Sequence, residues 1–179
     1  MLQPGITIAA DAWEVEGMNG ILYIHGTLTE SACRLEMDSA RQDIMLGDTG
    51  TGKLLRAGDR GEPAGFQLRL RDCLRSSSVT DERTGKTVWA YEQPSVSVSF
   101  RAEKDADNAE LISARGVSGM GLRIEDRSGQ DIRLGSRGTP LLLEPGQNTL
   151  HYTVYPERTR ALLVAGSYYS VVDFNLSYN

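Results

Sequence analysis

Apolar and polar residues alternate in several short stretches of the chain, a pattern that predicts β-strands with one buried face. In the clearest stretch, Phe66, Leu68 and Leu70 alternate with polar residues. The alternation slips before Cys73, which predicts a β-bulge there. Further alternating sets are Leu22, Ile24 and Leu28; Val96, Val98 and Phe100; Leu150, Tyr152 and Val154, ending at Pro156; and Tyr168, Val172, Phe174, Leu176 and Tyr178, within the segment from Ser167 to Asn179.

Turn signals separate these stretches, among them Asp48-Thr-Gly, Arg127-Ser-Gly and Glu144-Pro-Gly. Two stretches are candidates for a helix, Ser31–Arg41 and Ala102–Leu111. The second lacks an apolar stripe, so a solvated loop is expected there. No internal repeat or linker divides the chain. About seven or eight half-buried strands at this spacing predict an all-β, antiparallel sandwich.

Composition narrows the class of protein further. The 179 residues suit one domain, and 40% hydrophobic residues exclude a disordered chain. No stretch approaches the roughly 20 consecutive apolar residues of a membrane-spanning helix. The net charge of −5, without a cluster of basic residues, argues against nucleic-acid binding. Met1 is followed by no basic and apolar leader, so a secreted protein is expected to be seen here as its mature chain.

The two cysteines, Cys33 and Cys73, are an even pair in a β-rich chain. Such a pair suggests one disulfide and an oxidising compartment, and two buried free thiols are the alternative. The only histidines are His25 and His151, and no CxxC motif is present. A zinc site is therefore not expected, and neither is any other metal or cofactor.

One motif resembles a phosphate-binding loop, since Gly47-Asp-Thr-Gly-Thr-Gly-Lys53 has the required spacing up to its lysine. The next residue of that loop is a Ser or Thr that binds Mg²⁺, and here it is Leu54. A helix must also follow, yet Gly58 comes five residues after the lysine. A glycine-rich turn between strands is the better interpretation, and no small-molecule substrate is expected.

A second motif, Asp48-Thr-Gly, resembles the catalytic turn of aspartic proteases, which pair two such carboxylates. The chain has no second Asp-Thr/Ser-Gly. A turn that uses Asp and Gly for their local geometry explains the motif. No spacing indicates a Ser-His-Asp triad either, so the chain is not expected to be an enzyme.

At the C-terminal end of the chain, Gly166 is followed by thirteen residues with alternating apolar positions and a penultimate tyrosine, Tyr178. This pattern resembles the C-terminal signature of the pilin subunits of chaperone–usher fimbriae. The segment with Gly20, Leu22, Ile24, Gly26 and Leu28 is similar to the N-terminal donor strand of that family. Cys33 and Cys73 match its disulfide, and Gly119–Gly129 is similar to its glycine-led hairpin.

This resemblance implies an incomplete immunoglobulin-like sandwich that lacks its last strand and has an N-terminal donor-strand extension. Residues 1–30 would be the extension and residues 31–179 the pilin domain. A sandwich without its last strand exposes an apolar groove and an unpaired edge, so the chain alone is expected to be unstable. A neighbouring pilin would fill the groove with its own donor strand.

The resemblance also implies partners and a location. A periplasmic pilus chaperone would first pair with the C-terminal strand and hold the carboxylate of Asn179, and an outer-membrane usher would then exchange it for a donor strand. The protein would pass through the periplasm and end in an extracellular fimbrium. The contact strand would comprise Gly166, Tyr168, Val172, Phe174, Leu176, Tyr178 and Asn179.

Within this family, Ala32–Gln42 and the long segment 1–19 resemble the P-pilus terminator, a minor subunit at the base of the rod that donates a strand and accepts none. Four alternatives remain at this point. In the first, the chain is an adaptor or internal pilin that both donates and accepts a strand. In the second it is a fimbrial adhesin, and in the third a small β-fold hydrolase built around Asp48. In the fourth, the segment Gly20–Leu28 is simply the domain's own first strand.

Overall fold

The structure is a computed structural model that describes residues 22–24, 32–74, 78–80, 83–85, 87–89 and 93–178, with only the backbone described at 78–80 and 87–89. The chain divides into two units, Met1–Glu30 and Ser31–Asn179. In the first unit, residues 22–24 have no regular secondary structure, and Leu22 and Ile24 expose 82% and 84% of their surface. No helix within the described ranges is long and apolar enough to cross a membrane.

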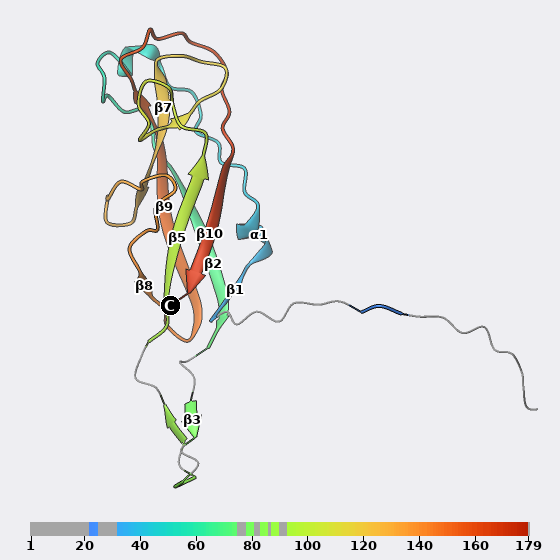
Figure 1. Ribbon diagram of the computed structural model, residues 1–179. Coiled ribbons are helices and arrows are strands. Elements are labelled where there is room, and N and C mark those ends of the chain that lie inside the picture. Colours follow the sequence, from blue (N-terminus) through green and yellow to red (C-terminus); the bar gives the residue numbers. More distant parts are fainter. Residues whose placement is uncertain are drawn as a thin grey trace, which may run out of the picture. The chain divides into compact units, whose positions relative to one another are not determined.

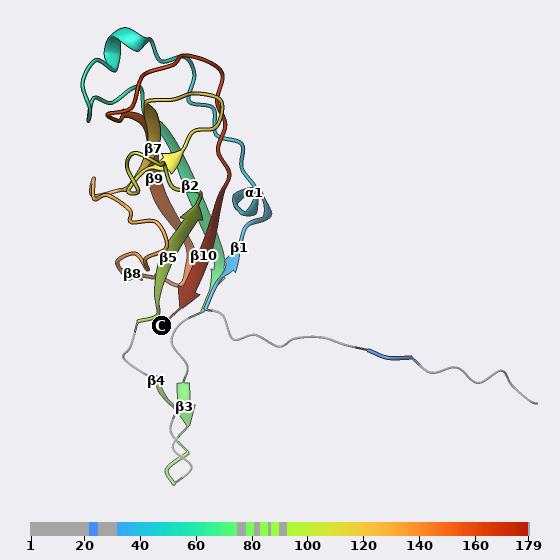
Figure 2. The same ribbon diagram turned by 45° about the horizontal axis from the view of Figure 1, so that its top comes forward.

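Antiparallel strands of the second unit form two packed sheets (Figures 1 and 2). The five-stranded sheet has the order β1-β2-β9-β7-β6, the three-stranded sheet the order β10-β5-β8, and β3 and β4 pair separately. The expected all-β sandwich is therefore confirmed. The elements are β1 (Arg34–Leu35), α1 (Met37–Ala40), η1 (Thr51–Lys53), β2 (Ala64–Cys73), β3 (Ser78–Thr80), β4 (Thr87–Trp89), β5 (Ser95–Ala102), β6 (Ile112–Ser113), β7 (Met120–Asp126), β8 (Leu141–Leu142), β9 (Gly146–Arg158) and β10 (Val172–Tyr178).

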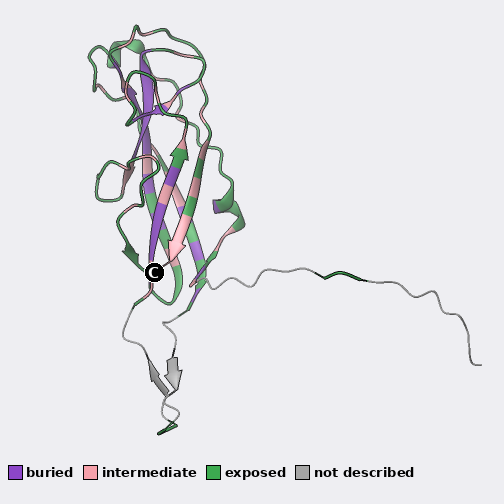
Figure 3. Ribbon diagram, viewed as in Figure 1, coloured by how far each residue is buried: buried purple, intermediate pink, exposed green. Residues whose placement is uncertain are grey.

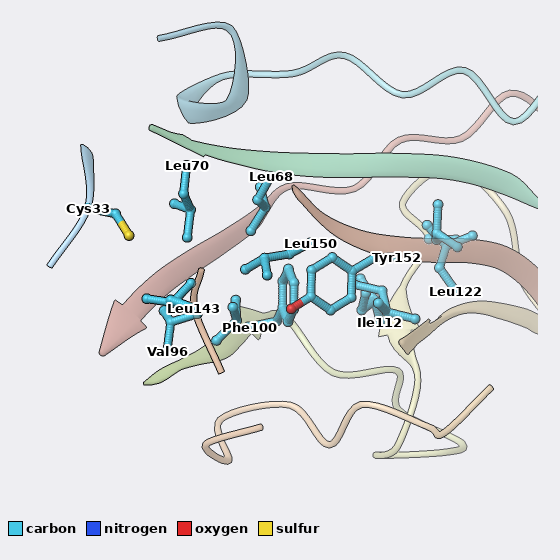
Figure 4. Close-up of a cluster of buried hydrophobic side chains, with 14 of the residues drawn as sticks. Cys33, Leu68, Leu70, Val96, Phe100, Ile112, Leu122, Leu143, Leu150 and Tyr152 are labelled. Carbon is cyan, nitrogen blue, oxygen red and sulfur yellow. The ribbon is translucent and has the colours of Figure 1, made fainter. Parts of the chain in front are cut away.

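The core lies between the two sheets, where the alternating residues meet. Phe100 is 1% exposed and packs edge-on against Tyr152 of the facing sheet, with 5.0 Å between ring centroids (Figure 4). Burial of these apolar faces is the main stabilising contribution, at about 1.5–3 kcal/mol for each large side chain. The other alternating core residues are Leu68, Leu70, Val96, Val98, Leu150 and Val154.

The slip before Cys73 is a β-bulge, as predicted. The register of β2 against β9 shifts between Leu70 and Cys73, and Asp72 takes a left-handed backbone conformation with φ of 53°. Cys33 and Cys73 form a disulfide, which confirms the expected bond. The bond fastens the start of β1 to the end of β2.

The alternation predicted that strand β9 ends at Pro156. That boundary is wrong, because β9 continues to Arg158. A proline in a strand is tolerated where its missing N–H would not serve the neighbouring ladder. The Pro156 carbonyl accepts a hydrogen bond from Gly61 N at 2.8 Å. The Pro156 carbonyl thus faces the segment before β2, and β9 still pairs with β7 on both sides of this residue.

The last strand is shorter than the alternation from Ser167 predicts, because β10 begins at Val172. Gly166 and Tyr168 precede it. Their segment pairs elsewhere, through isolated bridges of Val164 with Ser118 and Tyr169 with Arg115. Ten strands are described where about seven or eight were expected, because five of them are only two or three residues long.

Of the two candidate helical stretches, the described part of Ser31–Arg41 contains strand β1 and the four-residue helix α1. Ala102–Leu111 forms no helix beyond the end of β5, as expected. There the Asp105 carboxylate accepts hydrogen bonds from the backbone N–H groups of Asp107 and Asn108 at 2.9 and 3.0 Å, which stabilises a turn instead.

Candidate functional site

Among the described strands, β10 has a partner on one side only. It pairs with β5 along its whole length, from Val172 opposite Ala102 to Tyr178 opposite Val96. No strand in the described part of the chain runs along its other edge (Figures 1 and 2). An edge strand presents unpaired backbone donors and acceptors, which can template pairing with another chain.

The side chains of β10 are less buried than those of β5. Val96, Val98 and Phe100 of β5 expose 0%, 3% and 1% of their surface, whereas every core-facing residue of β10 is only half-buried (Figure 3). These β10 side chains pack against the core on one side and are uncovered on the other. We call this set the open-edge row; it consists of Val172, Phe174, Leu176 and Tyr178.

The open-edge row is linked to the opposite sheet directly by one hydrogen bond, and indirectly through Phe100 of its own sheet. The Tyr178 hydroxyl donates a hydrogen bond of 3.4 Å to the carbonyl of Cys33. In the middle of the row, Phe174 packs on Phe100 at a centroid distance of 6.4 Å, and Phe66 of β2 packs on the same ring at 6.1 Å. Half-buried apolar residues therefore stand on both sheets, with a buried aromatic ring between them.

The row and its surroundings are apolar and carry no acid–base machinery. Burial raises the pKa values of Tyr168 and Tyr178, which keeps both phenols neutral at physiological pH. Asp173 and Asn175 alternate with the row on β10 and are exposed. Within the described ranges, no three His, Cys, Asp or Glu residues group as metal ligands. The arrangement can bind an apolar extended segment.

The structure brings together four residues of the predicted contact strand, Val172, Phe174, Leu176 and Tyr178. Gly166 and Tyr168 lie ahead of β10, although Tyr168 packs against the core. Among the predicted donor residues, Leu22 and Ile24 are exposed. Gly20, Gly26, Leu28 and Asn179 lie outside the described residues.

Sequence reasoning missed the residues on the facing sheet. Phe66 and Leu35 are half-buried apolar residues packed against the core, and Phe66 reaches the same ring as Phe174. The alternation of β2 predicted that Phe66 faces the core. Nothing in the sequence indicated that it packs on the same ring as Phe174, because this depends on how the two sheets stack.

The second unit is thus an antiparallel β-sandwich whose last described strand, β10, has an open apolar edge. The comparisons give the family. A family model described as fimbrial protein matches residues 22–179, so the chain belongs to the fimbrial protein family.

Individual relatives agree with this assignment. The chain is 30% identical over 167 residues to a probable major fimbrial subunit, LpfA, of Escherichia coli O157:H7, covering 91% of this chain and 85% of that protein. It is 27% identical over 177 residues to the PAP fimbrial minor pilin protein of Escherichia coli, covering 98% and 86%. The crystal structure of the P pilus rod subunit PapA superposes with a TM-score of 0.67 at 23% identity, covering 83% of this chain and 100% of that one.

The chain is therefore a pilin of the chaperone–usher type. It is a structural subunit and not an enzyme. Fimbrial subunits form extracellular fimbriae, so its partners include neighbouring pilins. Asp48, considered above as a catalytic residue, is an exposed residue of the loop before η1.

Proposed function

We propose that the chain assembles by donor-strand exchange, with the open-edge row lining the groove that accepts a neighbour's strand. The observation that carries the proposal is β10 itself, which no described strand pairs along one edge and which is half-exposed on its core-facing side. An added strand would complete the sheet through backbone hydrogen bonds and cover the apolar row. Strand addition of this kind combines backbone affinity with side-chain specificity.

The donated strand is proposed to be Gly20–Leu28 of each chain. Leu22 and Ile24 expose over four-fifths of their surface, and burying a side chain of this size contributes about 1.5–3 kcal/mol. Residues 1–30 act as the extension and residues 31–179 as the pilin domain, which agrees with the two units of the chain. On this proposal the segment serves another subunit and is not the domain's own first strand.

The chaperone and usher follow from the same open edge. A subunit with an uncovered apolar row is prone to aggregation until the row is covered. A periplasmic chaperone would pair with β10 and hold the carboxylate of Asn179, and the outer-membrane usher would exchange it for a donor strand. The protein thus passes through the periplasm before it joins the extracellular fimbria.

We infer that the subunit both accepts and donates a strand. The row is half-buried at each of its four positions, so no position along β10 is sealed by the described part of the domain. A second candidate is a terminating minor subunit at the base of the rod, which donates only. The similarity to the PAP minor pilin over 98% of the chain supports it, as does the resemblance of Ala32–Gln42 to the terminator.

The test is to co-purify the chain with its cognate chaperone and add donor-segment peptides of sibling subunits. Release of the chaperone with uptake of a peptide supports an accepting subunit. Refusal of every peptide, while Gly20–Leu28 of this chain enters other subunits, supports the terminator. Phe174→Arg should abolish uptake because it places a charge in the row, whereas Asn175→Arg, on the exposed face of the same strand, should leave it unchanged.

A further inference from the structure

The segment before β10 exposes apolar side chains that the groove does not use. Residues 161–171 contain no charged residue. Leu163 and Tyr168 of this segment pack against the core, whereas four other large apolar residues expose between 50% and 79% of their surface. We call these four the apolar strip; it consists of Leu162, Val164, Tyr169 and Val171. Apolar residues that gather on a surface in this way are typical of an interaction site.

Hydrogen bonds hold the apolar strip in place. Val164 exchanges two backbone hydrogen bonds with Ser118, of 3.0 and 3.3 Å, and Tyr169 exchanges two with Arg115, of 3.0 and 3.1 Å. The backbone of the strip is paired at these points, so what it offers a partner is its side chains. A surface that is already fixed loses little conformational freedom when a partner binds, which favours binding.

The opposite end of the domain also exposes apolar side chains. Leu74 exposes 66% of its surface, and its backbone N–H donates a hydrogen bond of 2.8 Å to the carbonyl of Ala32. Leu142 exposes 67% and pairs with Ser95 at the start of β5. Because β5 and β10 are antiparallel, the start of β5 lies at the end of β10, beside Tyr178. The apolar strip, in contrast, adjoins the beginning of β10 (Figure 1). We call Leu74 and Leu142 the entry pair.

Strand donation brings these two ends together. All the described strand pairs are antiparallel, and a donor strand antiparallel to β10 leaves the groove at Val172, next to the strip. In the donating subunit, position 28 is only four residues ahead of Ala32, and four residues span at most about 14 Å. The donating domain therefore begins beside the strip, at the end that carries the entry pair.

We propose that the apolar strip binds the folded domain of a second copy of this chain, which docks through its entry pair. The contact is head-to-tail, because the strip and the entry pair lie at opposite ends of one domain, and its repetition extends a fibre. This inference rests on the proposed function, since the geometry starts from strand donation. It adds a contact between folded domains, which stops one subunit from swivelling on the next.

The first test compares a free donor peptide with a whole subunit. The acceptor carries Leu162→Lys/Val164→Lys; both side chains are at least half exposed, so the variant should fold. It should take up a synthetic peptide of residues 18–30 as the natural acceptor does, because β10 is unchanged. In a pair formed with a whole subunit, the rotational correlation time of the donating domain should fall to that of a lone domain. Ser128→Lys, an exposed residue after the far end of β7, should leave the correlation time unchanged.

The second test locates the contact by cross-linking. A donor with Leu74→Cys and an acceptor with Val164→Cys should form a disulfide-linked pair after strand exchange under mild oxidation. An acceptor with Ser128→Cys should form none. This test stands by itself if the lysine variant fails to form its chaperone complex.

Each outcome separates one claim from another. Refusal of the peptide by the natural acceptor overturns the proposed function. Uptake of the peptide together with equal correlation times for the natural and lysine pairs, or without the Leu74–Val164 cross-link, overturns the domain contact and leaves strand exchange standing. If the correlation time is high only in pairs with a sibling subunit, the second copy is overturned as the partner.

Discussion

Arg123 and Glu157 form a bidentate ion pair on the face of the five-stranded sheet that points away from the core. Arg123 Nε and Nη2 donate hydrogen bonds of 2.6 and 2.8 Å to the two carboxylate oxygens of Glu157. Their side chains expose only 9% and 8% of their surface. Arg123 Nη1 also donates to Asp131 at 2.8 Å. The pair fastens β7 to β9, two strands that carry much of the core.

Removal of one partner of this pair should destabilise the domain strongly. Arg123→Met leaves Glu157 buried without its main hydrogen-bond donor, which should lower the free energy of unfolding by about 2–4 kcal/mol. Chemical denaturation with a saturating donor peptide measures the change. The double variant Arg123→Met/Glu157→Leu should recover most of the loss, since no unpaired charge remains. Equal destabilisation by the single and double variants would contradict this account.

Acid should loosen the same face of the sheet. A hydrogen bond from the Tyr155 hydroxyl, with a further contribution from Arg60, holds the pKa of Glu125 below its ordinary value of 4.5. A carboxylate with a depressed folded-state pKa stabilises the fold above its unfolded pKa, and this stability is lost as the pH falls through the folded value. Stability should therefore decrease below about pH 4.5.

The variant Glu125→Gln isolates this effect. Its urea midpoint, measured from pH 6 to about pH 3, should fall less steeply than that of the natural chain. Glu144→Gln provides the control, because Glu144 is exposed in the turn before β9. An unchanged slope in Glu125→Gln would mean that Glu125 is not coupled to folding.

The bulge of β2 gives a prediction about backbone strain. Asp72 has a φ of 53°, a left-handed conformation that is unstrained for Gly, mildly strained for Asn and Asp, and more strained for β-branched residues. Asp72→Gly should raise the free energy of unfolding by about 0.5–1 kcal/mol, and Asp72→Val should lower it by about 1–2 kcal/mol. The ion pair with Arg34 contributes little, because both side chains are more than half exposed.

Urea denaturation at constant m-value measures the two changes. Asp72→Asn is the matched control, since asparagine accepts the same backbone conformation without the charge. If valine were tolerated as well as glycine, the left-handed conformation would not be needed to bring Cys73 to its disulfide.

Much of this fold could be predicted because four long strands, β2, β5, β9 and β10, each bury one face. Their alternation identifies the core-facing residues directly, and the slip before Cys73 marks the bulge. The extension of β9 through Pro156 could not be read in the same way, since it depends on the segment that pairs with it. The Arg123–Glu157 ion pair could not be predicted either, because only the register of β7 against β9 brings these two residues together.

The candidate site was predictable on one side only. The period of two placed Val172, Phe174, Leu176 and Tyr178 on one face of the last strand. Phe66 belongs to the other sheet. It contacts Phe100, the residue that pairs with Phe174, and this contact arises from the stacking of the two sheets. The sequence pattern predicts which face of a strand is buried. Which residues of one sheet contact which residues of the other has to come from the structure.

Donation of Gly20–Leu28 can be tested separately from acceptance. Gly26→Trp in the donor should block its capture by a neighbouring subunit, because an indole cannot pass between a groove floor and the added strand. The chaperone complex of the variant should still form, since β10 is unchanged. Thr27→Trp is the matched control: in an added strand with position 26 toward the groove, position 27 would face the opposite side, so this variant should be captured normally. The measurement is the yield of donor–acceptor complex in a strand-exchange assay with purified chaperone complexes. Normal capture of Gly26→Trp would show that this segment is not the donor strand, and the open edge of β10 would then need a different partner.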